Sequence, residues 1–505
     1  MIPLVESWRG SGYTVQEISA LSASAVAEEF PTWLLEGLQW RSGSQVALID
    51  GATGRRVTIG ELRSLVDDAA AGLGGSDDVG PIVLGLSNRI IDVVAYLALA
   101  RLRGPLVLTS GRSSGERLVE LARRFRADNV AADVGMEGWR CWATIGRPGS
   151  RLGVWRRTGV SRPDVNPLNR VLLPTSGTRG QARSVRLGNA NLLSNAFQIA
   201  SALGLQREDV AVLNLPLCHA YGLSVLHAHL AVGSALLAPA APQTSERYWH
   251  ALSDGRVTVL AGVPTSYRQI VHLGLLNMLP PSVRLATQAG GFLETATSDA
   301  VHSRVVAQGG DGFVRMYGQT EATARIAVLP AAEYTSDETL VGHVVDGGEV
   351  SIHPGSGEVV YRGPNVMLGY AVNYDDLGRG DVSGGLLHTR DLGRVDFDGR
   401  LHVQGRLDDV VKVAGTRVAL SEVEHALSPC SVAVFELNDA LVICLDDCAH
   451  DLTSVRRTVA SLAGLPLATV MAIRVRHLGN EPGLVSKPNI AVLRELAAAG
   501  ALGDL

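Results

Sequence analysis

The stretch VLLPTSGTRGQARSVRLGNANL, residues 171–192, joins an apolar run to a loop of small hydroxylated residues and glycines. The apolar residues Val171 to Leu173 predict a buried strand. In the loop, glycines permit positive φ and close backbone approach, and successive N–H groups can cradle phosphate oxygens. The side-chain hydroxyls add hydrogen-bond donors. The residues that we expect to bind phosphate here are Thr175, Ser176, Gly177, Thr178 and Gly180.

Two other interpretations of this loop have to be weighed. Gly177 to Ser184 has the spacing of a Walker loop, but Ala182 and Arg183 stand where that motif requires Gly and Lys. A P-loop NTPase also needs a metal-binding Asp on a later strand, and the chain has no convincing one. Taken alone, the loop favours an ordinary Ser/Gly turn, so the rest of the chain has to decide.

Length and composition exclude several classes of protein. A chain of 505 residues is too long for one core, so two or more domains are expected. The net charge of −5 gives no reason to expect a nucleic-acid partner. No apolar run reaches the eighteen or so residues of a membrane span, and the N-terminus lacks the pattern of a signal peptide. We therefore expect a cytoplasmic protein that binds neither nucleic acid nor membrane.

The cysteine and lysine positions are also informative. Five cysteines at irregular spacing fit a reducing cytosol. Cys444, Cys448 and His450 lie close together, but they lack a fourth zinc ligand, so we favour a structural role for them. Only two lysines occur, Lys412 and Lys487, and the other 43 of the 45 basic residues are arginine. A lysine kept in such a background suggests a site that needs a compact ammonium.

The pattern of apolar residues predicts an α/β protein. Residues 46–132 and 171–317 alternate strands with helices, which is typical of a wound, parallel sheet. Thr58 and Glu61 form a capping box at the start of one such helix. A helix is expected over Leu21–Leu38, and residues 134–168 are expected to be an irregular connection. After Val341 the predicted strands become short, which indicates a separate antiparallel or barrel-like unit.

The predicted domains are a large one, residues 1–405, and a small α+β one, residues 406–505. The expected fold is thus a large N-terminal domain of wound α/β sheets with a β-barrel-like subdomain, followed by this small domain. Its last element is a predicted helix at Ile490–Ala499.

Further motifs follow the loop in a fixed order, and together they carry a resemblance. They are Leu215–Gly222, Tyr317–Glu321, Gly357–Tyr370, His388–Gly393, Gly405–Gly415 and Lys487. With the phosphate loop in front, this series resembles the adenylate-forming superfamily of acyl-CoA ligases, stand-alone adenylation domains and luciferase-like enzymes. The resemblance covers most of the chain and is closest to acyl-CoA ligases. Both lysines fall where that family usually has lysine.

The resemblance implies ATP, Mg²⁺ and coenzyme A as reactants or cofactors, and it assigns roles to the nucleotide-binding residues. Glu321 is similar to the magnesium ligand, and Tyr317 to the aromatic residue that packs on adenine. Thr320 would donate a hydrogen bond to the α-phosphate. Asp391 would accept the ribose hydroxyls, and Arg406 would reach the ribose or phosphate. Arg183 keeps the positive charge of the phosphate loop.

The resemblance also implies two alternating half-reactions. Lys487 would bridge the substrate carboxylate and the α-phosphate, and Asp408 resembles the hinge about which the small domain then rotates. That rotation brings Lys412 and Gly415 to the site, where the glycine lets the pantetheine arm pass. His219 would shape the mouth of the pocket, although a buried structural histidine explains it as well. The remaining expected pocket and nucleotide positions are Tyr221, Gly222, Ala289, Gly290, Gly291 and Gly318.

The chain departs from the family pattern chiefly where ATP is handled. Arg179 and Ser184 replace loop residues that are usually Thr and Gly, and Arg390 stands where the family has Gly. The thioester motif, Gly405–Val418, stays close to pattern. One hypothesis is that adenylation is weak or lost and that the protein accepts an acyl-adenylate, made by a separate adenylating enzyme. The alternative is harmless drift.

The acyl substrate and the acceptor stay open. The motif at His219–Gly222 offers no acid to hold an α-amine, which favours a non-amino carboxylic acid. An enzyme that loads a carrier protein would share every motif with a CoA ligase. A non-catalytic relative that binds acyl groups or adenylates is disfavoured because Glu321, Asp391 and both lysines are retained.

Overall fold

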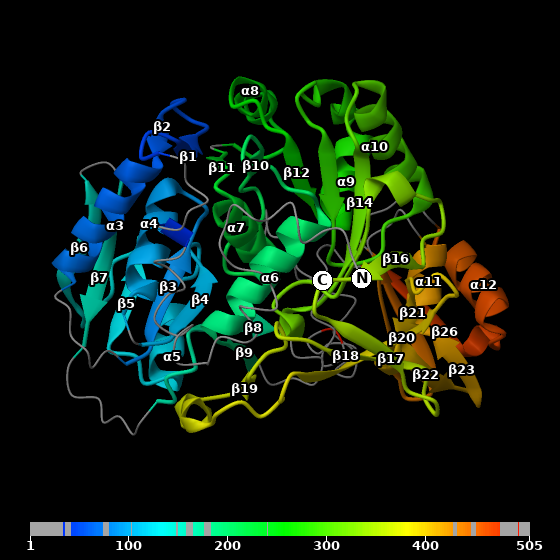
Figure 1. The fold of residues 1–505 in the computed structure, drawn as a ribbon. Helices are drawn as coiled ribbons and strands as arrows, with labels where there is room; N and C mark the ends of the chain where they lie inside the picture. The colour runs from blue at the N-terminus through cyan, green and yellow to red at the C-terminus, as the bar shows by residue number, and fades with distance from the viewer. Residues whose placement is uncertain are drawn as a thin grey trace.

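The computed structural model describes residues 34–35, 42–73, 80–102, 104–147, 150–157, 165–175, 183–239, 241–427, 432–445, 451–474 and 493. Two large sheets form the frame of this part of the chain (Figure 1). One has eight strands and the other thirteen. A pair of smaller sheets lies C-terminal to them in sequence. The fold is mixed α/β, as the sequence predicts.

The eight-stranded sheet has the order β19-β9-β8-β4-β3-β5-β7-β6. Its centre, formed by β3, β4, β5 and β8, is parallel, and α4 and α5 are the crossover helices from β3 to β4 and from β4 to β5. Its strands are β3 (Ile82–Leu86), β4 (Leu106–Ser110), β5 (Asn129–Ala132), β6 (Arg140–Arg147), β7 (Ser150–Arg156), β8 (Val171–Thr175), β9 (Arg183–Leu187) and β19 (Gly369–Ala371).

The thirteen-stranded sheet has the order β17-β18-β20-β21-β16-β15-β14-β13-β12-β10-β11-β1-β2. Strands β1 (Val46–Asp50), β10 (Val210–Val212), β11 (Ala235–Ala238), β12 (Val259–Gly262), β13 (Leu285–Gln288) and β14 (Gly312–Tyr317) run parallel, and β2 (Arg56–Thr58) closes that edge. The antiparallel strands are β15 (Ala327–Leu329), β16 (Leu340–Val344), β17 (Glu349–Ile352), β18 (Glu358–Arg362), β20 (Leu386–Val395) and β21 (Leu401–Arg406). The antiparallel unit expected after Val341 is therefore hydrogen-bonded to the parallel half in one sheet.

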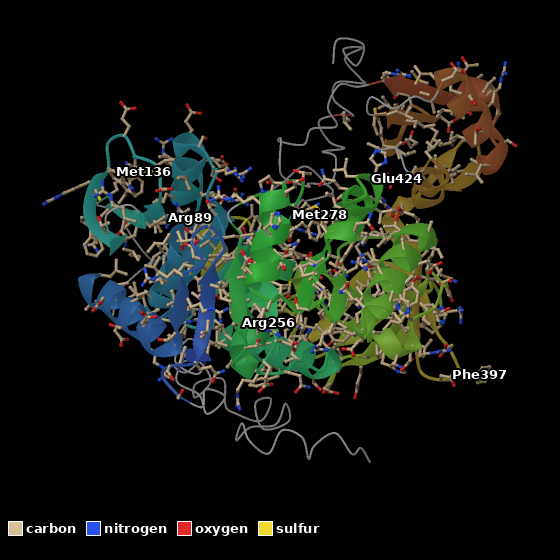
Figure 2. All side chains as sticks on the ribbon, turned by 90° about the horizontal axis from the view of Figure 1, so that it is seen from above. Arg89, Met136, Arg256, Met278, Phe397 and Glu424 are labelled. Atoms are coloured by element: carbon tan, nitrogen blue, oxygen red, sulfur yellow. The ribbon has the colours of Figure 1, made fainter. Side chains whose placement is uncertain are left out.

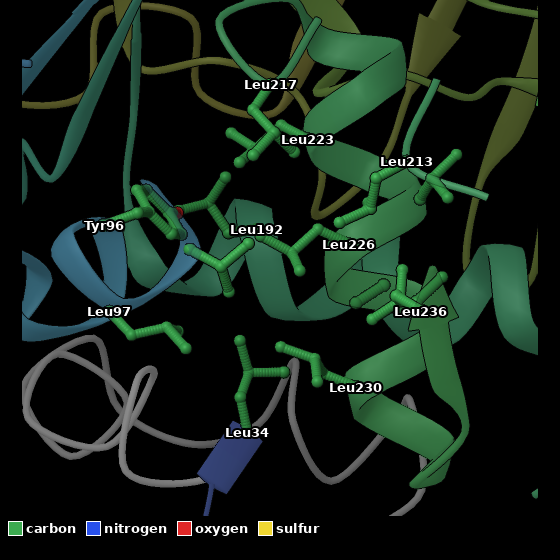
Figure 3. Close-up of a cluster of buried hydrophobic side chains, with 14 of the residues drawn as sticks. Leu34, Tyr96, Leu97, Leu192, Leu213, Leu217, Leu223, Leu226, Leu230 and Leu236 are labelled. Atoms are coloured by element: carbon green, nitrogen blue, oxygen red, sulfur yellow. The ribbon is translucent and has the colours of Figure 1, made fainter. Parts of the chain in front are cut away.

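The main core lies between the two large sheets. Helices α3 (Ile59–Gly72), α4 (Ile90–Ala100), α6 (Asn189–Ala202) and α7 (Ala220–Val232) contribute leucines that pack against both. Figure 3 shows Leu192 of α6, Leu223, Leu226 and Leu230 of α7, and Tyr96 of α4 converging there. The capping box predicted at the start of α3 is present, because Thr58 and Glu61 exchange hydrogen bonds.

Helices cover the outer faces as well. Helix α5 (Gly115–Arg124) packs on the far side of the eight-stranded sheet through Leu118 and Leu121. Helices α8 (Glu246–Asp254), α9 (Pro264–His272) and α10 (Thr295–Ala307) cover the parallel half of the other sheet. The short 3₁₀ helices of this large part are η2 (Leu275–Met278), η3 (Thr320–Ala322), η4 (Ala331–Glu333) and η5 (Tyr374–Gly378).

The chain leaves the large sheet at the end of β21 and enters a smaller unit through η6 (Leu407–Asp409). This unit holds β22 (Val410–Val413), β23 (Thr416–Ala419), α11 (Leu420–Ala426), β24 (Val432–Leu437), β25 (Ala440–Leu445), α12 (Leu452–Ala463), η7 (Leu467–Thr469) and β26 (Val470–Arg474). It has its own apolar core. Glu424 of α11 marks it in Figure 2, to one side of the large sheets.

One prediction from the sequence is wrong, and two predicted helices lie almost entirely outside the described residues. Residues 134–168, expected to be irregular, contain the hairpin β6–β7, so that prediction is wrong over its central part. Leu152 and Val154 of β7 point into the core, which explains why this Arg- and Gly-rich segment pairs with β5. The helices expected at Leu21–Leu38 and Ile490–Ala499 lie almost entirely outside the described residues; Leu34 and Leu35, the described part of the first, are helical.

No helix in the described ranges combines the length and the apolar character that crossing a membrane requires.

Candidate active site

The loop that follows β14 forms the centre of the candidate site. Strand β14 ends at Tyr317, and η3 places Thr320 and Glu321 one turn later. Both residues are half-buried. A Cβ on Gly318 would lie 2.0 Å from the carbonyl oxygen of Ala324, so the loop can fold back on itself only with glycine there. Close backbone packing therefore accounts for Gly318, and its expected role in the pocket stays a prediction.

Asp391 lies in a cluster of hydrogen-bond donors. The hydroxyl of Tyr317 donates to Asp391 Oδ2 at 2.5 Å, and Nε of Arg406 lies 3.0 Å from Oδ1. Gln319 Nε2 donates to the backbone carbonyl of Thr389 at 3.2 Å and lies 3.4 Å from Asp391 Oδ2. Burial together with the nearby carboxylate raises the pKa of Tyr317 well above its ordinary value, so the phenol stays protonated and donates.

This cluster depends on the curvature of the sheet. Tyr317 ends β14 and Asp391 lies in β20, four strand spacings away in the sheet order. A flat sheet would separate those strands by about 19 Å. Because the two side chains touch, the sheet must curl strongly over β15, β16 and β21. That curl supports the barrel-like subdomain predicted from the sequence.

Glu321 is held by residues from the other large sheet. The hydroxyl of Tyr370, on β19, donates to Glu321 Oε1 at 2.7 Å. The guanidinium of Arg183, on β9, lies over the Tyr370 ring at 3.8 Å. Burial and the Glu321 carboxylate raise the pKa of Tyr370, while the Arg183 and Arg406 charges oppose that shift. The site therefore bridges both sheets, with a cation, a phenol and a carboxylate in series.

The donor set suits one magnesium ion held jointly with phosphate oxygens. No cluster of three or more potential ligands occurs among the described residues, which excludes an all-protein cage in that part of the chain. Mg²⁺ commonly takes one or two carboxylates and completes its shell with water and substrate phosphates. Glu321 fits that role, because Tyr370 occupies Oε1 and leaves Oε2 available.

The phosphate loop is described only at its two ends. Thr175 ends β8, and its hydroxyl donates to the backbone carbonyl of Arg183 at 3.2 Å, which closes the base of the loop. Arg183 begins β9. The predicted phosphate ligands Ser176, Gly177, Thr178 and Gly180 lie outside the described residues, as does Arg179.

The expected pocket residues of the second motif lie at the start of α7. His219 is the N-cap position of α7, and desolvation lowers its pKa although part of its surface stays exposed. Tyr221 is half-buried, and its hydroxyl donates to the backbone carbonyl of Thr287 at 3.0 Å. A Cβ on Gly222 would lie 2.2 Å from the Pro216 carbonyl oxygen. Gly222 is thus explained by the contact between helix and loop.

The third pocket element follows β13. Ala289 is buried, and Gly290 and Gly291 have φ values of 89° and 154°. The Gln288 side chain donates to the Gly291 carbonyl at 2.8 Å and fixes this turn. Positive φ accounts for glycine at both positions. The turn lies at the carboxyl end of β13, next to the end of β14, where Tyr317 stands.

The thioester motif forms a hairpin in the small unit. Lys412 on β22 is exposed, and its backbone lies opposite that of Arg417 on β23 in the antiparallel register. Ala414 and Gly415 both have positive φ, at 48° and 81°, as a two-residue type I′ turn requires. A Cβ on Gly415 would meet no atom within 4 Å, so the tip is open. Asp408 lies in η6 between the large and small parts, and Lys487 lies outside the described residues.

Known proteins similar to this chain are AMP-binding enzymes and CoA ligases. Residues 153–371 match the family model described as AMP-binding enzyme. Over these residues the chain is similar to the AMP-binding enzymes of the adenylate-forming superfamily. 4-Coumarate–CoA ligase 5 of Oryza sativa subsp. japonica is 28% identical over 448 residues, which is 80% of each chain. Oxalate–CoA ligase of Arabidopsis thaliana is 26% identical over 409 residues, covering 74% of this chain and 78% of that one.

Solved structures of adenylate-forming enzymes share the fold. One is o-succinylbenzoate CoA synthetase from Bacillus subtilis with its acyl-adenylate intermediate, at a TM-score of 0.71 and 19% identity, covering 92% of this chain and 98% of that one. Another is ATP-bound MatB from Rhodopseudomonas palustris, at a TM-score of 0.71 and 20% identity, covering 94% and 99%. These similarities confirm the two-part α/β architecture predicted from the sequence.

Three residues near the site received no role from the sequence. Tyr370 stands at the end of a motif, but its contact with Glu321 joins two sheets and leaves no local signal. Gln319 is one of the donors near Asp391. Arg325 is buried four residues beyond Glu321. A charged residue inside the apolar stretch Ala322–Leu329 is the signal that could have identified it.

Proposed function

We propose that this chain is an acyl-CoA ligase that converts a carboxylic acid without an α-amine to its CoA thioester through an acyl-adenylate. The observation that carries the proposal is a pair of carboxylates at the end of β14: Asp391 of β20, which accepts a hydrogen bond from Tyr317, and Glu321 of the following loop, which accepts one from Tyr370 at a single oxygen. One carboxylate can accept ribose hydroxyls and the other can hold Mg²⁺. The relatives named for 4-coumarate and oxalate support the reaction class.

In the first half-reaction, an oxygen of the substrate carboxylate attacks the α-phosphorus of ATP, and pyrophosphate leaves. Bound Mg²⁺ would offset the charge of the phosphates. Glu321 would hold the ion, and Tyr370 orients Glu321 by its hydrogen bond. Asp391 would position the ribose. Thr320 and Lys487 are proposed to donate to the α-phosphate and to bridge the two anions.

In the second half-reaction, the CoA sulfur attacks the acyl carbonyl, and AMP leaves with the carboxylate oxygen. We propose that the small unit turns about Asp408 and presents the β22–β23 hairpin to the site. The open tip at Gly415 suits a hairpin that must lie beside an extended pantetheine arm. The large domain would then comprise residues 1–405 and the mobile domain residues 406–505. We also propose a cytoplasmic location.

The altered phosphate loop leaves two forms of the proposal. In one, the chain carries out both half-reactions. In the other, Arg179 and its neighbours have weakened adenylation, and the chain takes its acyl-adenylate from a separate enzyme. A carrier protein in place of CoA is the second candidate acceptor, because the motifs do not separate the two thiols.

The deciding experiment separates the half-reactions. Purified protein is given CoA with either free acid plus ATP and Mg²⁺, or a synthetic acyl-adenylate, across a panel of acids, and acyl-CoA and AMP are quantified. Product from both routes indicates a complete ligase. Product from the adenylate alone indicates a lost first step. Acyl transfer to a phosphopantetheinylated carrier but not to CoA would indicate the loading enzyme, and no product by any route would refute the proposal.

Asp391→Asn provides the matched variant for this assay. It keeps the shape but removes the charge that accepts the ribose hydroxyls, and we expect kcat/KM for ATP to fall by roughly 10- to 100-fold. Asp398→Asn, on the exposed turn after β20, is the control and should leave the value unchanged.

A further inference from the structure

Arg325 is a buried cation beside the expected acyl pocket. It lies between η3 and β15, four residues beyond Glu321, and only 2% of its surface is exposed. Its guanidinium lies over the ring of Tyr221 at 4.1 Å, from the motif at the start of α7. A buried charge is expected to be paired or fully hydrogen-bonded, because its desolvation is costly.

The hydrogen bonds of Arg325 fall short of that expectation. Nη1 donates to the backbone carbonyl of its neighbour Ala324 at 3.0 Å, and Nε points at the thioether sulfur of Met316 at 3.1 Å. A thioether is a weak acceptor. Within the described part of the chain, no carboxylate pairs with Arg325, and its Nη2 has no hydrogen-bond partner.

Two other buried arginines have more carbonyl acceptors than Arg325, although Nε of Arg186 and Nη2 of Arg315 are also buried without a hydrogen-bond partner among the described residues. Arg186 donates to the backbone carbonyls of Leu368, Arg379 and Gly380 and to the side-chain oxygen of Asn169. Arg315 donates through Nη1 to the backbone carbonyls of Asp337 and Leu340. Arg325 has a single carbonyl acceptor, although it is as buried as Arg186.

The surroundings of Arg325 supply no negative charge. Burial raises the pKa of Tyr221, so its phenol stays neutral. Burial lowers the pKa of His229 to about 4, so that histidine is neutral near pH 7. Burial also lowers the pKa of Arg325 itself, to about 10, which still leaves the guanidinium protonated at pH 7.

The position of Arg325 connects it to the acyl end of the site. A small interior cavity of about 10 Å³, the size of one water molecule, is lined by side chains that include Arg325, Tyr221, Thr287, Met316, Ser224 and His229. A carboxylate would therefore enter it only with a rearrangement of these side chains. Thr287 lies two residues before Ala289 and accepts or donates a hydrogen bond with Tyr221 at 3.0 Å. Met316 precedes Tyr317. The cavity is thus lined by residues from α7, β13 and β14, the elements expected to hold the acyl group.

We propose that Arg325 binds a second carboxylate on the acyl group, so that the preferred substrate is a dicarboxylic acid activated at one end. This inference rests on the proposed function for the reaction at the other carboxyl group. A substrate carboxylate would supply the negative charge that the described residues around Arg325 lack, and it could accept two parallel hydrogen bonds from the guanidinium. Tyr221 would guide the substrate past its ring. A monocarboxylic acid would leave the cation buried and unpaired.

The test is a binding measurement that requires neither half-reaction. Non-hydrolysable acyl-sulfamoyl adenosines are prepared in pairs of equal chain length, with or without a terminal carboxylate, from four to eight carbons. Their affinities are measured by calorimetry for the wild type and for Arg325→Met, which keeps length and removes charge. We expect the best-fitting diacyl analogue to bind the wild type about 100-fold more tightly than its monoacyl partner. In Arg325→Met the ratio should approach one, because only the diacyl analogue loses affinity.

Two further variants keep the test decisive. Arg325→Gln replaces Arg325→Met if the latter does not fold. Arg315→Met removes a different buried arginine and should lower stability while leaving the binding ratio unchanged. A wild-type ratio near one at every chain length, or a ratio that survives in Arg325→Met, would overturn the proposal. Absence of acyl-CoA formation with a ratio that still depends on Arg325 would refute only the proposed thioester chemistry.

Discussion

Tyr370 holds the carboxylate on which the proposed metal binding depends. Its hydroxyl fixes Glu321 Oε1, and the Arg183 guanidinium on its ring places positive charge behind that pair. Because the Tyr370 hydroxyl fixes Oε1, it also sets the direction in which Oε2 of the same carboxylate points. The orientation of Glu321 thus depends on a residue from a different sheet.

Tyr370→Phe tests this arrangement. We expect the Mg²⁺ concentration for half-maximal activity to rise by about 10-fold, the effect of one hydrogen bond to a charged group, with most of the activity recovered at high Mg²⁺. Magnesium titrations of the full reaction measure it. Tyr361→Phe removes another buried phenol, one that donates to Asn365, and should not change the magnesium requirement. Equal shifts in both variants would contradict the assignment.

Arg390 departs from the family pattern at a position where the backbone geometry favours glycine. It occupies left-handed backbone with φ of 61°, and its N–H donates to Glu358 Oε1 at 2.9 Å. A side chain with a Cβ is strained in that region, which is where glycine is usual. The family glycine beside Asp391 therefore meets a backbone requirement, and this chain tolerates arginine there at a cost.

Comparing Arg390→Gly with Arg390→Ala isolates that cost. Both variants remove the same arginine contacts, but only glycine relieves the strain at the Cβ. We expect Arg390→Gly to be the more stable by about 1 kcal/mol. Urea unfolding of the two variants side by side measures the difference, and an alanine variant of equal or greater stability would show that the backbone is unstrained.

At the scale of the elements, helix α7 carries the expected pocket residue Tyr221 and two buried histidines, His227 and His229. His227 accepts or donates a hydrogen bond with Tyr96 at 2.9 Å, and burial lowers the pKa of His227 to about 3. In the unfolded chain the same imidazole titrates near pH 6.5. Between those values the unfolded state binds the extra proton, so the free energy of unfolding falls as the pH is lowered through that window.

His227→Gln should therefore flatten the acid side of the stability profile. From pH 6.5 to pH 5 the wild type should lose about 2 kcal/mol through this histidine alone, and the variant should lose correspondingly less. Urea unfolding at pH 7.5, 6.0 and 5.0 provides the comparison. His272→Gln, at an exposed position at the end of α9, should keep the wild-type slope. A slope that His227→Gln leaves unchanged would contradict the prediction.

The apolar pattern predicts strands at residues 82–86, 129–132, 235–238, 349–352 and 358–362, which are the bounds of β3, β5, β11, β17 and β18. The first three are buried along their whole length, whereas β17 alternates exposed and half-buried residues. Helix α10 and the hairpin β6–β7 could not be predicted, because small and polar residues dominate the first and only Leu152 and Val154 anchor the second. The motifs identify the site residues, but contacts such as Tyr370 with Glu321 depend on how two sheets meet, which no local pattern encodes.

At the scale of the whole molecule, the two lysines divide the proposed half-reactions between two ends of the small domain. Lys412 stands on the β22–β23 hairpin, and Lys487 follows the last described strand. Each half-reaction should therefore depend on one lysine and tolerate the loss of the other. This division would follow from the proposed domain movement rather than from either residue alone.

Lys487→Met and Lys412→Met make this division measurable. We expect Lys487→Met to lose at least about 100-fold in acyl-adenylate formation while keeping thioester formation from a synthetic adenylate. Lys412→Met should show the opposite pattern, with a smaller effect of about 10-fold. Single-turnover assays of each step measure both. Parallel losses in the two steps would show that the lysines do not act at separate stages.

The curl of the thirteen-stranded sheet has a consequence for attempts to graft this chemistry elsewhere. Tyr317 and Asp391 meet only because β15, β16 and β21 bend the sheet between them. A flat α/β scaffold that received the Tyr317–Glu321 segment would gain the residues and lose their partner. The part that would have to be transferred is therefore the whole curved run of strands from β14 to β20. A homologue with the short motif but without those strands would have the Tyr317–Glu321 residues and no carboxylate at the position of Asp391.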